Sequence, residues 1–402
     1  MLPQILGPVL PAALGVFAVT LLALLVLAVL RRARAAWWLL LVAEAAVIAL
    51  IGWHWFSPRD YPRPYAAQPA PPPCPLAAQV AGSGFRVGVA VSEPVLKQHP
   101  ELLRAEFNSV TPENATKWRQ LLKGGRLGAY DFAPADRIVD GARALGLQVR
   151  GHVLVWGHLE IPDGLEEAVR SAADPAGTLR EAMRHHIRTT LDHFRGRIGQ
   201  WDVVNEPLSW TSAKMHDNVF QRTLGTDYIE HAFRCAREAD PSVALYLNEQ
   251  LWEYDGARAT QFLQLLAELK RRGVPIDGIG LQGHINMVPV PTAAALRAYL
   301  DQIAALGFKV EFTEVDCRLR MFDGAADPYT AQAEAVAELV RVARNHPACR
   351  GVTFWGLGDR GNWYDELPPF SLLRPNDPYL WDDAMRPKPV HAAVAHALGG
   401  PR

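Results

Sequence analysis

The sequence predicts an α/β protein whose main domain is a (β/α)₈ barrel. From about residue 80, eight short runs rich in β-branched residues alternate with longer amphipathic stretches. Polar and aromatic side chains gather where these runs end, and barrel enzymes carry their chemistry at the ends of strands. An open, doubly wound sheet shows the same alternation, so periodicity alone favours the barrel only slightly. No G-x-G-x-x-G or P-loop motif follows the first run, however, and such a loop is typical of a nucleotide-binding open sheet.

The expected elements follow one another in a regular order. We expect strands at 85–91, 107–110, 148–156, 200–205, 244–247, 278–282, 309–315 and 351–355. Between them, amphipathic patterns predict helices that include 135–145, 179–194, 228–238, 257–271, 293–306 and 331–344. The barrel domain is therefore expected to occupy 80–402.

Two long apolar runs precede this domain. The run 5–30 has no charged residue, and Glu44 is the only charge in the run 35–56. Each run is long enough to cross a bilayer as a helix, which takes about 20 residues. Residues 1–56 are therefore expected to form a transmembrane hairpin of two helices. A cleaved signal peptide is the alternative for the first run.

Positively charged residues tend to stay on the cytoplasmic side of a membrane. Three arginines lie in the short turn between the two apolar runs, so this turn is expected to be cytoplasmic. The chain is then membrane-anchored, and the barrel domain is extracytoplasmic, in the periplasm or at the cell surface.

A proline-rich linker is expected at 57–79. It contains eight prolines, which favour an extended, polyproline-like spacer. Cys74 lies within it, and its role stays open.

Composition excludes several classes of protein. The chain has 402 residues, 49% of them hydrophobic, and a net charge of −1. These values exclude a collagen or a disordered tail, and they argue against a nucleic-acid partner, which calls for a basic excess. The four cysteines are too few for a disulfide framework, and none has metal-ligand spacing. The oligomeric state stays open.

The polar residues at the expected strand ends are typical of a carbohydrate site. Acids and amides bind sugar hydroxyls, aromatic rings cover sugar faces, and two carboxyl groups can flank a glycosidic bond. The residues concerned are Glu113, Asn114, Lys117, His152, Trp156, Asn205, Glu206, Asn248, Gln282, His284, Glu314, Asp316, Trp355, Asp359 and Trp363.

Six motifs in this order resemble glycoside hydrolase family 10, the endo-β-1,4-xylanases. They lie at 113–118, 151–156, 201–207, 280–284, 313–316 and 353–356, within a resemblance that runs from about 84 to 396. The resemblance implies a (β/α)₈ barrel with the catalytic acid after strand four and the nucleophile after strand seven. The strand count above agrees with that order.

The resemblance also implies roles for single residues. Glu206 would be the general acid/base and Glu314 the nucleophile of a retaining double displacement. Asn205 would bind the 2-hydroxyl of the sugar, and His284, close to Asp316, would orient the nucleophile. Neither a metal nor a cofactor is implied, because the two carboxyl groups supply the chemistry.

Further residues would bind the substrate, which is implied to be xylan or xylo-oligosaccharides cleaved at internal bonds. The resemblance implies that Glu113, Asn114, Lys117 and His152 bind hydroxyls on the donor side, and that Trp156, Trp355 and Trp363 form the walls of that subsite. Gln282 would contact the sugar at the cleavage site.

The sequence departs from the family pattern in two places. Gly157-His158-Leu159 stands where the family usually has His-x-Gln, so a polar contact to the donor-side sugar is expected to be lost. Residues 248–250 read Asn-Glu-Gln in place of Asn-Asp-Tyr. Branch tolerance and chain-length preference therefore stay open. A β-glucanase of the same mechanism and a non-catalytic, membrane-anchored glycan-binding module are the alternatives.

Overall fold

The computed structural model describes residues 42, 44–46, 61–67, 74–251, 254–286, 290–366 and 375–400. The two expected transmembrane helices, 5–30 and 35–56, lie almost wholly outside these residues, so the anchor stays a prediction. Within the described part of the chain, no helix combines the length and the apolar character that crossing a membrane requires.

The chain divides into two compact units. One combines Arg63–Asn362 with Asp377–Arg402, and the other combines Met1–Pro62 with Trp363–Asn376.

The first unit is built on a closed sheet of parallel strands. Its order is β6-β5-β4-β3-β2-β1-β9-β8-β7, and β6 also pairs with β8, which closes the barrel. The two-residue β7 follows β6 and pairs with the later part of the same strand, β8. Counted together, β6 and β7 occupy one position in the barrel, which therefore has eight strand positions. The expected (β/α)₈ barrel is confirmed. The strands are β1 (Arg86–Val91), β2 (Ser109–Pro112), β3 (Gln148–Trp156), β4 (Gln200–Asn205), β5 (Ala244–Glu249), β6 (Gly278–Leu281), β7 (His284–Ile285), β8 (Lys309–Cys317) and β9 (Cys349–Phe354).

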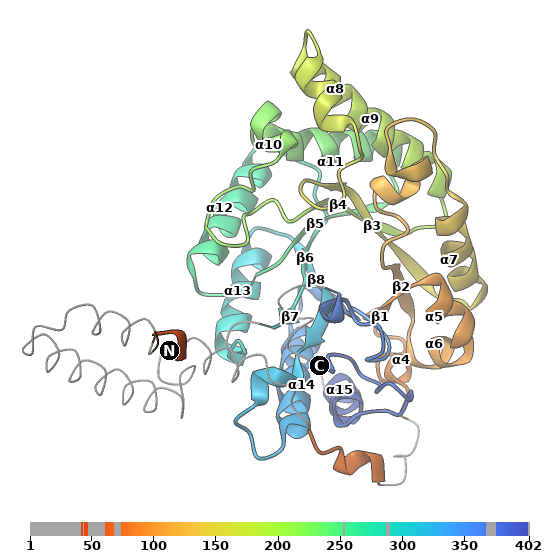
Figure 1. The fold of residues 1–402 in the computed structure, drawn as a ribbon, viewed down its shortest axis with the longest axis vertical. Coiled ribbons are helices and arrows are strands. Elements are labelled where there is room, and N and C mark those ends of the chain that lie inside the picture. Colours follow the sequence, from red (N-terminus) through yellow and green to blue (C-terminus); the bar gives the residue numbers. More distant parts are fainter. Residues whose placement is uncertain are drawn as a thin grey trace, which may run out of the picture. The chain divides into compact units, whose positions relative to one another are not determined.

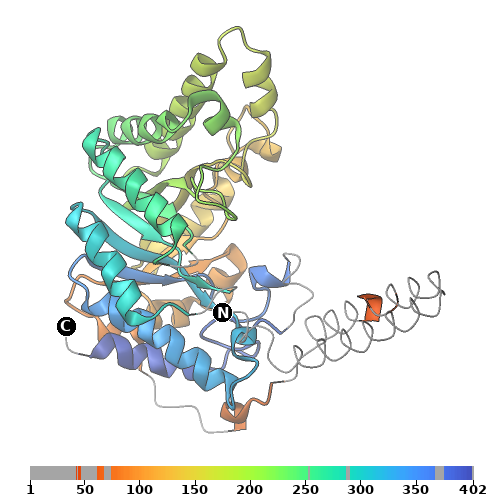
Figure 2. The same cartoon turned by 90° about the vertical axis from the view of Figure 1, so that its left-hand side faces the viewer.

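Helices surround this sheet (Figure 1). They bury the outer face of the strands, and α14 and α15 lie side by side next to β9 (Figure 2). The helices are α4 (Leu76–Gln79), α5 (Glu93–Gln98), α6 (Pro100–Glu106), α7 (Ala133–Ala144), α8 (Leu165–Ser171), α9 (Pro175–Phe194), α10 (Val219–Leu224), α11 (Asp227–Ala239), α12 (Ala257–Arg271), α13 (Ala293–Ala305), α14 (Pro328–Asn345) and α15 (Pro389–Gly399). Short 3₁₀ turns are η1 (Pro64–Ala67), η2 (Arg119–Leu121), η3 (Lys123–Gly125) and η4 (Leu319–Phe322).

The two longest of these helices, α9 and α14, begin with the same local signal. Asp174 precedes α9 and accepts a hydrogen bond from the backbone of Gly177, and Asp327 does the same for Tyr329 at the start of α14. Each aspartate is followed by a proline, whose fixed φ suits the first helical position and whose missing N–H needs no partner there. These Asp-Pro pairs fix where the two helices begin.

The expected linker is shorter than predicted, because its last residues belong to the barrel. Leu76 is fully buried and begins α4, and its backbone N–H donates to Glu106 Oε2 over 3.0 Å. The proline pattern ends at Pro75, and the Leu-Ala-Ala-Gln segment that follows is free to form a helical turn.

Residues before this point also contact the barrel. Arg63 donates to Tyr329 Oη over 3.1 Å and to Asp377 Oδ2 over 2.9 Å, and the ring of Tyr65 packs edge-on against Tyr329. These contacts dock the chain at the first turn of α14.

The second unit contains the turn η5 (Trp363–Asp365). Within it, the rings of Trp363 and Tyr364 lie 4.0 Å apart, and Asn376 Nδ2 donates to Asp365 Oδ1 over 2.8 Å. Trp363 was predicted to bind substrate, and this role stays a prediction.

Candidate active site

Two buried carboxyl groups lie at the carboxyl ends of two strands of the barrel, β4 and β8. Glu206 directly follows β4, Glu314 lies near the end of β8, and their residues are 6% and 4% exposed. The backbone N–H of Glu206 donates to the Asn248 carbonyl over 2.9 Å, and its φ is +51°. A left-handed conformation in a non-glycine residue costs about 1–3 kcal/mol and is concentrated at functional sites.

Four donors hold the carboxyl group of Glu206. Its Oε1 accepts from Gln282 Nε2 (2.7 Å) and from Asn205 Nδ2 (3.4 Å). Its Oε2 accepts from the indole N–H groups of Trp156 (3.2 Å) and Trp210 (2.9 Å). The carboxyl group is therefore fixed in direction before any substrate binds.

Glu314 has a different set of partners. Asn248 Nδ2 donates to its Oε1 over 2.7 Å, and His284 Nε2 lies 3.3 Å from its Oε2. The other ring nitrogen of His284, Nδ1, lies 2.8 Å from Asp316 Oδ2. Burial would lower the pKa of His284, but the carboxylates of Asp316 and Glu314 outweigh it and raise this pKa to about 10. The imidazolium therefore donates from both nitrogens, to Asp316 and to Glu314. Its role in orienting the nucleophile stays a prediction.

We expect His284→Gln to weaken the fold more at pH 6 than at pH 10. The pKa of His284 is raised from about 6.5 in the unfolded protein to about 10 in the folded one, so protonation of this residue stabilises the fold. This stabilisation is complete below about pH 6.5 and is lost as the pH rises through about 10. Urea unfolding of both proteins at the two pH values measures the difference. His185→Gln, which removes an exposed imidazole on α9, is the control. A loss as large at pH 10 as at pH 6 would contradict the expectation.

Asn248 connects the two carboxyl groups. Its Nδ2 donates to Asn205 Oδ1 over 2.9 Å as well as to Glu314, and its Oδ1 accepts from Thr313 Oγ1 over 2.7 Å. Asn205 in turn donates to Glu206. Sequence reasoning placed Asn248 at a strand end but gave it no role, because the link joins side chains from three different strands, β4, β5 and β8.

The predicted donor-side residues from the β2 end lie together. Lys117 Nζ donates to Asn114 Oδ1 over 2.6 Å and lies 4.8 Å from the centre of the Trp156 ring. Burial lowers the pKa of Lys117, and carboxylates around it oppose that effect. Glu113 follows β2 and is fixed by its N–H bond to the Val91 carbonyl.

Two more predicted residues join this group to the nucleophile. The ring of Trp355, which is 8% exposed, packs at steep angles against His152 (5.1 Å) and His284 (6.4 Å). His152 Nδ1 lies 3.0 Å from Asp202 Oδ2. Apart from Trp363 and Asp359, the structure thus brings the predicted site residues to one end of the barrel.

Asp359 belongs to the fold rather than to this site. It was among the strand-end residues typical of sugar binding, but its carboxylate is paired with the buried Lys388 Nζ at 2.9 Å. It also accepts from the Tyr379 backbone N–H. Burial raises the pKa of Asp359 to about 7, although Lys388 opposes this shift.

A charged network below the site was not predicted. Arg150 lies between Asp202 and Glu311, and all three side chains are at most 2% exposed. Glu311 also accepts from Tyr246 Oη (2.8 Å) and Gln200 Nε2 (3.1 Å). Because Asp202 also contacts His152, the network supports the floor of the site.

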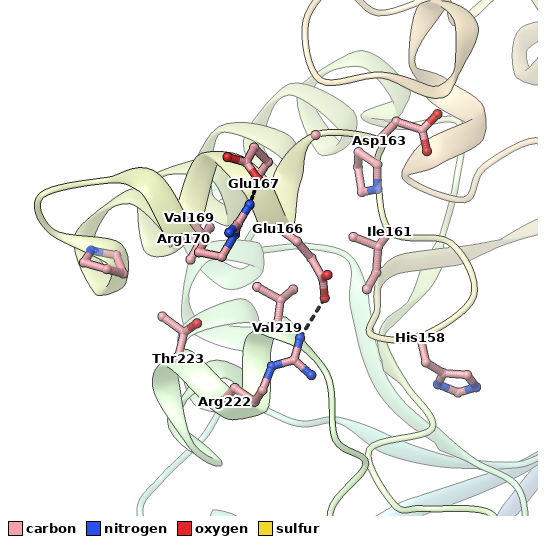
Figure 3. Close-up of a pocket in the computed structure, with 13 residues that line it drawn as sticks. His158, Ile161, Asp163, Glu166, Glu167, Val169, Arg170, Val219, Arg222 and Thr223 are labelled. Atoms are coloured by element: carbon pink, nitrogen blue, oxygen red, sulfur yellow. Dashed lines mark hydrogen bonds and ion pairs between the residues drawn. The ribbon is translucent and has the colours of Figure 1, made fainter.

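The segment that departs from the family pattern also reaches Glu206. His158 Nε2 lies 3.3 Å from Glu206 Oε2, so a polar group lies beside the Glu206 carboxyl despite the expected loss of a contact. His158 also borders a hollow of about 790 Å³ beside α8 and α10. Figure 3 shows Glu166 and Arg222, 2.8 Å apart, across this hollow from His158.

No group of three or more His, Cys, Asp or Glu side chains within the described ranges is arranged to hold a metal ion. The chemistry that the site itself offers is that of paired carboxyl groups.

Comparison with known proteins agrees with this arrangement. The sequence matches Glycosyl hydrolase family 10 over residues 76–397. Endo-1,4-beta-xylanase 5 of Pyricularia oryzae is 34% identical over 293 residues, which cover 73% of this chain and 69% of that protein. The crystal structure of native xylanase 10B from Thermotoga maritima superposes with a TM-score of 0.73 at 31% identity, covering 81% of this chain and 98% of that one. Xylanase 10B from Thermotoga petrophila, solved in complex with xylobiose, gives 0.72 at 30% identity, with coverages of 81% and 97%. The chain belongs to glycosyl hydrolase family 10.

Proposed function

We propose that this chain is a retaining endo-1,4-β-xylanase that hydrolyses internal bonds of xylan and xylo-oligosaccharides. The observation that carries the proposal is the pair of buried carboxyl groups with unlike partners, one held by neutral donors and the other beside an imidazolium. The relatives named as xylanases and the xylobiose bound by one of them support xylan as the substrate.

In this proposal the two glutamates have separate roles. Glu314, oriented by Asn248 and His284, attacks the anomeric carbon while Glu206 gives its proton to the leaving oxygen. Glu206 then takes a proton from water, which attacks the glycosyl-enzyme and releases Glu314. Both steps invert the anomeric carbon, so the product keeps the β configuration.

The residues around the carboxyl groups bind the sugar in this scheme. Asn205 and Gln282 lie beside Glu206 and take the hydroxyls of the sugar at the cleavage site. Lys117 and His152 bind the donor-side sugars, and Trp355 forms the wall of that subsite.

The test is hydrolysis by the full chain, beside the variant Glu314→Ala. We expect xylan and xylo-oligosaccharides to be cleaved faster than cellulose or mixed-linkage glucan, and NMR of the first product to show the β anomer. Faster cleavage of a glucan would identify a β-glucanase instead. If wild type releases no more sugar than Glu314→Ala from any β-glycan, the chain is a glycan-binding module.

We further propose that residues 1–56 anchor the enzyme in a membrane, with the catalytic domain on the extracytoplasmic side. The two long apolar runs, of which only the second holds a charged residue (Glu44), and the arginines between them support this proposal. The anchor predicts that the full chain stays with membranes after carbonate extraction and that external protease reaches the domain. N-terminal sequencing separates this case from a cleaved signal peptide, which would leave a shortened chain.

A further inference from the structure

The loop after β4 places an exposed tryptophan against Glu206. The indole Nε1 of Trp210 donates to Glu206 Oε2 over 2.9 Å, yet the residue is 37% exposed. The other indole donor, Trp156, comes from β3 and has Lys117 over its ring. Trp210 therefore combines a contact to this carboxyl group with ring surface that is open to a ligand.

The loop is folded so that this position is fixed. Leu208 and Met215 form an antiparallel bridge, and the backbone N–H of Ser209 donates to the Lys214 carbonyl over 2.8 Å. Trp210 lies in the turn that these two pairs close, so the backbone on both sides of the turn is held by hydrogen bonds.

Two histidines fix the indole ring from the side. The rings of His158 and His216 are stacked 4.0 Å apart, and Trp210 meets His158 nearly at right angles at 4.5 Å. Burial, helped by His216, lowers the pKa of His158 to about 3, so the imidazole next to Glu206 is neutral. Packing rather than charge therefore holds this cluster, and it joins the loop after β3 to the loop after β4.

The place of Trp210 relative to Glu206 identifies the sugar it would meet. The acid carboxyl lies beside the oxygen of the leaving sugar, because it must protonate that oxygen. The predicted donor-side walls are less exposed, with Trp355 only 8% exposed. Of the two indoles that contact this carboxyl group, Trp156 belongs to the predicted donor-side wall, so the exposed ring of Trp210 would meet the sugar on the leaving side of the bond.

We propose that Trp210 is a positioning and specificity residue: its indole N–H aligns the Glu206 carboxyl group, and its exposed ring binds the departing xylose unit. This inference rests on the proposed function, in which Glu206 is the acid. It predicts that Trp210 matters when the leaving group is a sugar, which needs both a proton and a binding surface. It matters little when the leaving group departs unprotonated.

The test compares xylotetraose with 2,4-dinitrophenyl β-xylobioside, whose phenolate leaves without a proton. Trp210→Phe keeps a ring and removes the N–H, and we expect kcat/KM on xylotetraose to fall about tenfold, the size expected when a hydrogen bond is lost to a carboxyl group that becomes charged as it gives up its proton. On the dinitrophenyl substrate, the formation of the glycosyl-enzyme should change less than about twofold, because it needs no acid. Trp210→Ala should lose about a further fivefold on xylotetraose, mainly through KM, because the ring is gone.

Leu127→Ala is the matched control, since it removes another exposed apolar side chain (39% exposed) from a loop at the same end of the barrel. It should change neither substrate. A Trp210→Phe variant that loses equally on both substrates shows only a structural role, and one that loses on neither has no role in positioning; each overturns the proposal. A wild-type chain that fails to cleave xylotetraose contradicts the proposed function itself, before any variant is compared.

Discussion

Replacing Glu314 with alanine should lower kcat on xylo-oligosaccharides by about 10⁴- to 10⁶-fold, the range seen when one member of a catalytic unit is removed. The glycosyl-enzyme then has no carboxylate on which to form. The partners of Glu314 remain: Asn248 keeps its bond to Asn205, and His284 keeps its bond to Asp316. The variant should therefore fold, and circular dichroism and thermal unfolding check this.

The same variant offers a direct test of the assignment. With an aryl xylobioside, azide should enter the space left by the side chain and attack the anomeric carbon while the phenolate leaves. The product is a glycosyl azide of inverted configuration. In Glu206→Ala, azide should instead attack the glycosyl-enzyme and give the retained configuration. If the two configurations are exchanged, so are the roles of the two glutamates.

Glu311→Ala should destabilise the barrel by about 3–5 kcal/mol, because it leaves the partly buried Arg86 without its carboxylate and the buried Arg150 with only Asp202. Glu311 is 2% exposed and is paired with Arg150 and Arg86. Burial would raise the pKa of Glu311, but these two arginines outweigh it and hold the pKa below its ordinary value. Urea unfolding at pH 7 measures the loss.

The loss of stability should depend on pH. Because the pKa of Glu311 is lower in the folded than in the unfolded protein, its carboxylate stabilises the fold at pH values above the unfolded-state pKa. The difference in free energy of unfolding between wild type and variant should therefore be complete above about pH 5 and become smaller below about pH 4. Glu181→Ala is the control: it breaks an exposed pair with Arg184 and should cost less than about 1 kcal/mol. A similar small loss for Glu311→Ala would show that the network does not stabilise the barrel.

Much of the barrel could be predicted from the sequence, because buried parallel strands read as apolar runs with polar ends. The bounds of β3, β4 and α12 agree with the predicted ranges. β5 extends to Glu249, beyond the predicted end at Leu247, because the Glu249 carboxylate accepts the Leu208 backbone N–H and pairs with Arg258. Such compensation comes from other loops and leaves no local signal. Helices such as α5 and α10, at six residues, are too short to show a period.

Some residues of the site could likewise be predicted from the sequence, and others could not. The predicted catalytic pair and its supporting residues lie in motifs at strand ends, where spacing and residue type make such a prediction possible. The bridging role of Asn248 and the contacts of Trp210 depend on which loops meet, and Trp210 lies outside the motifs. The charges of Arg150 and Glu311 would ordinarily argue against burial, and only their pairing across the barrel allows it.

The closure of the sheet bears on how the protein is made. β1 pairs with β9, so the first strand of the barrel has no partner on one side until the last strand has left the ribosome. At about 5–20 residues per second, the 258 residues from Val91 to Cys349 take roughly 13–50 s to synthesise. During that time the unpaired edge of β1 can pair with other extended chains. Biogenesis of this enzyme is therefore expected to depend on holding chaperones, and its yield should fall when translation outpaces their supply.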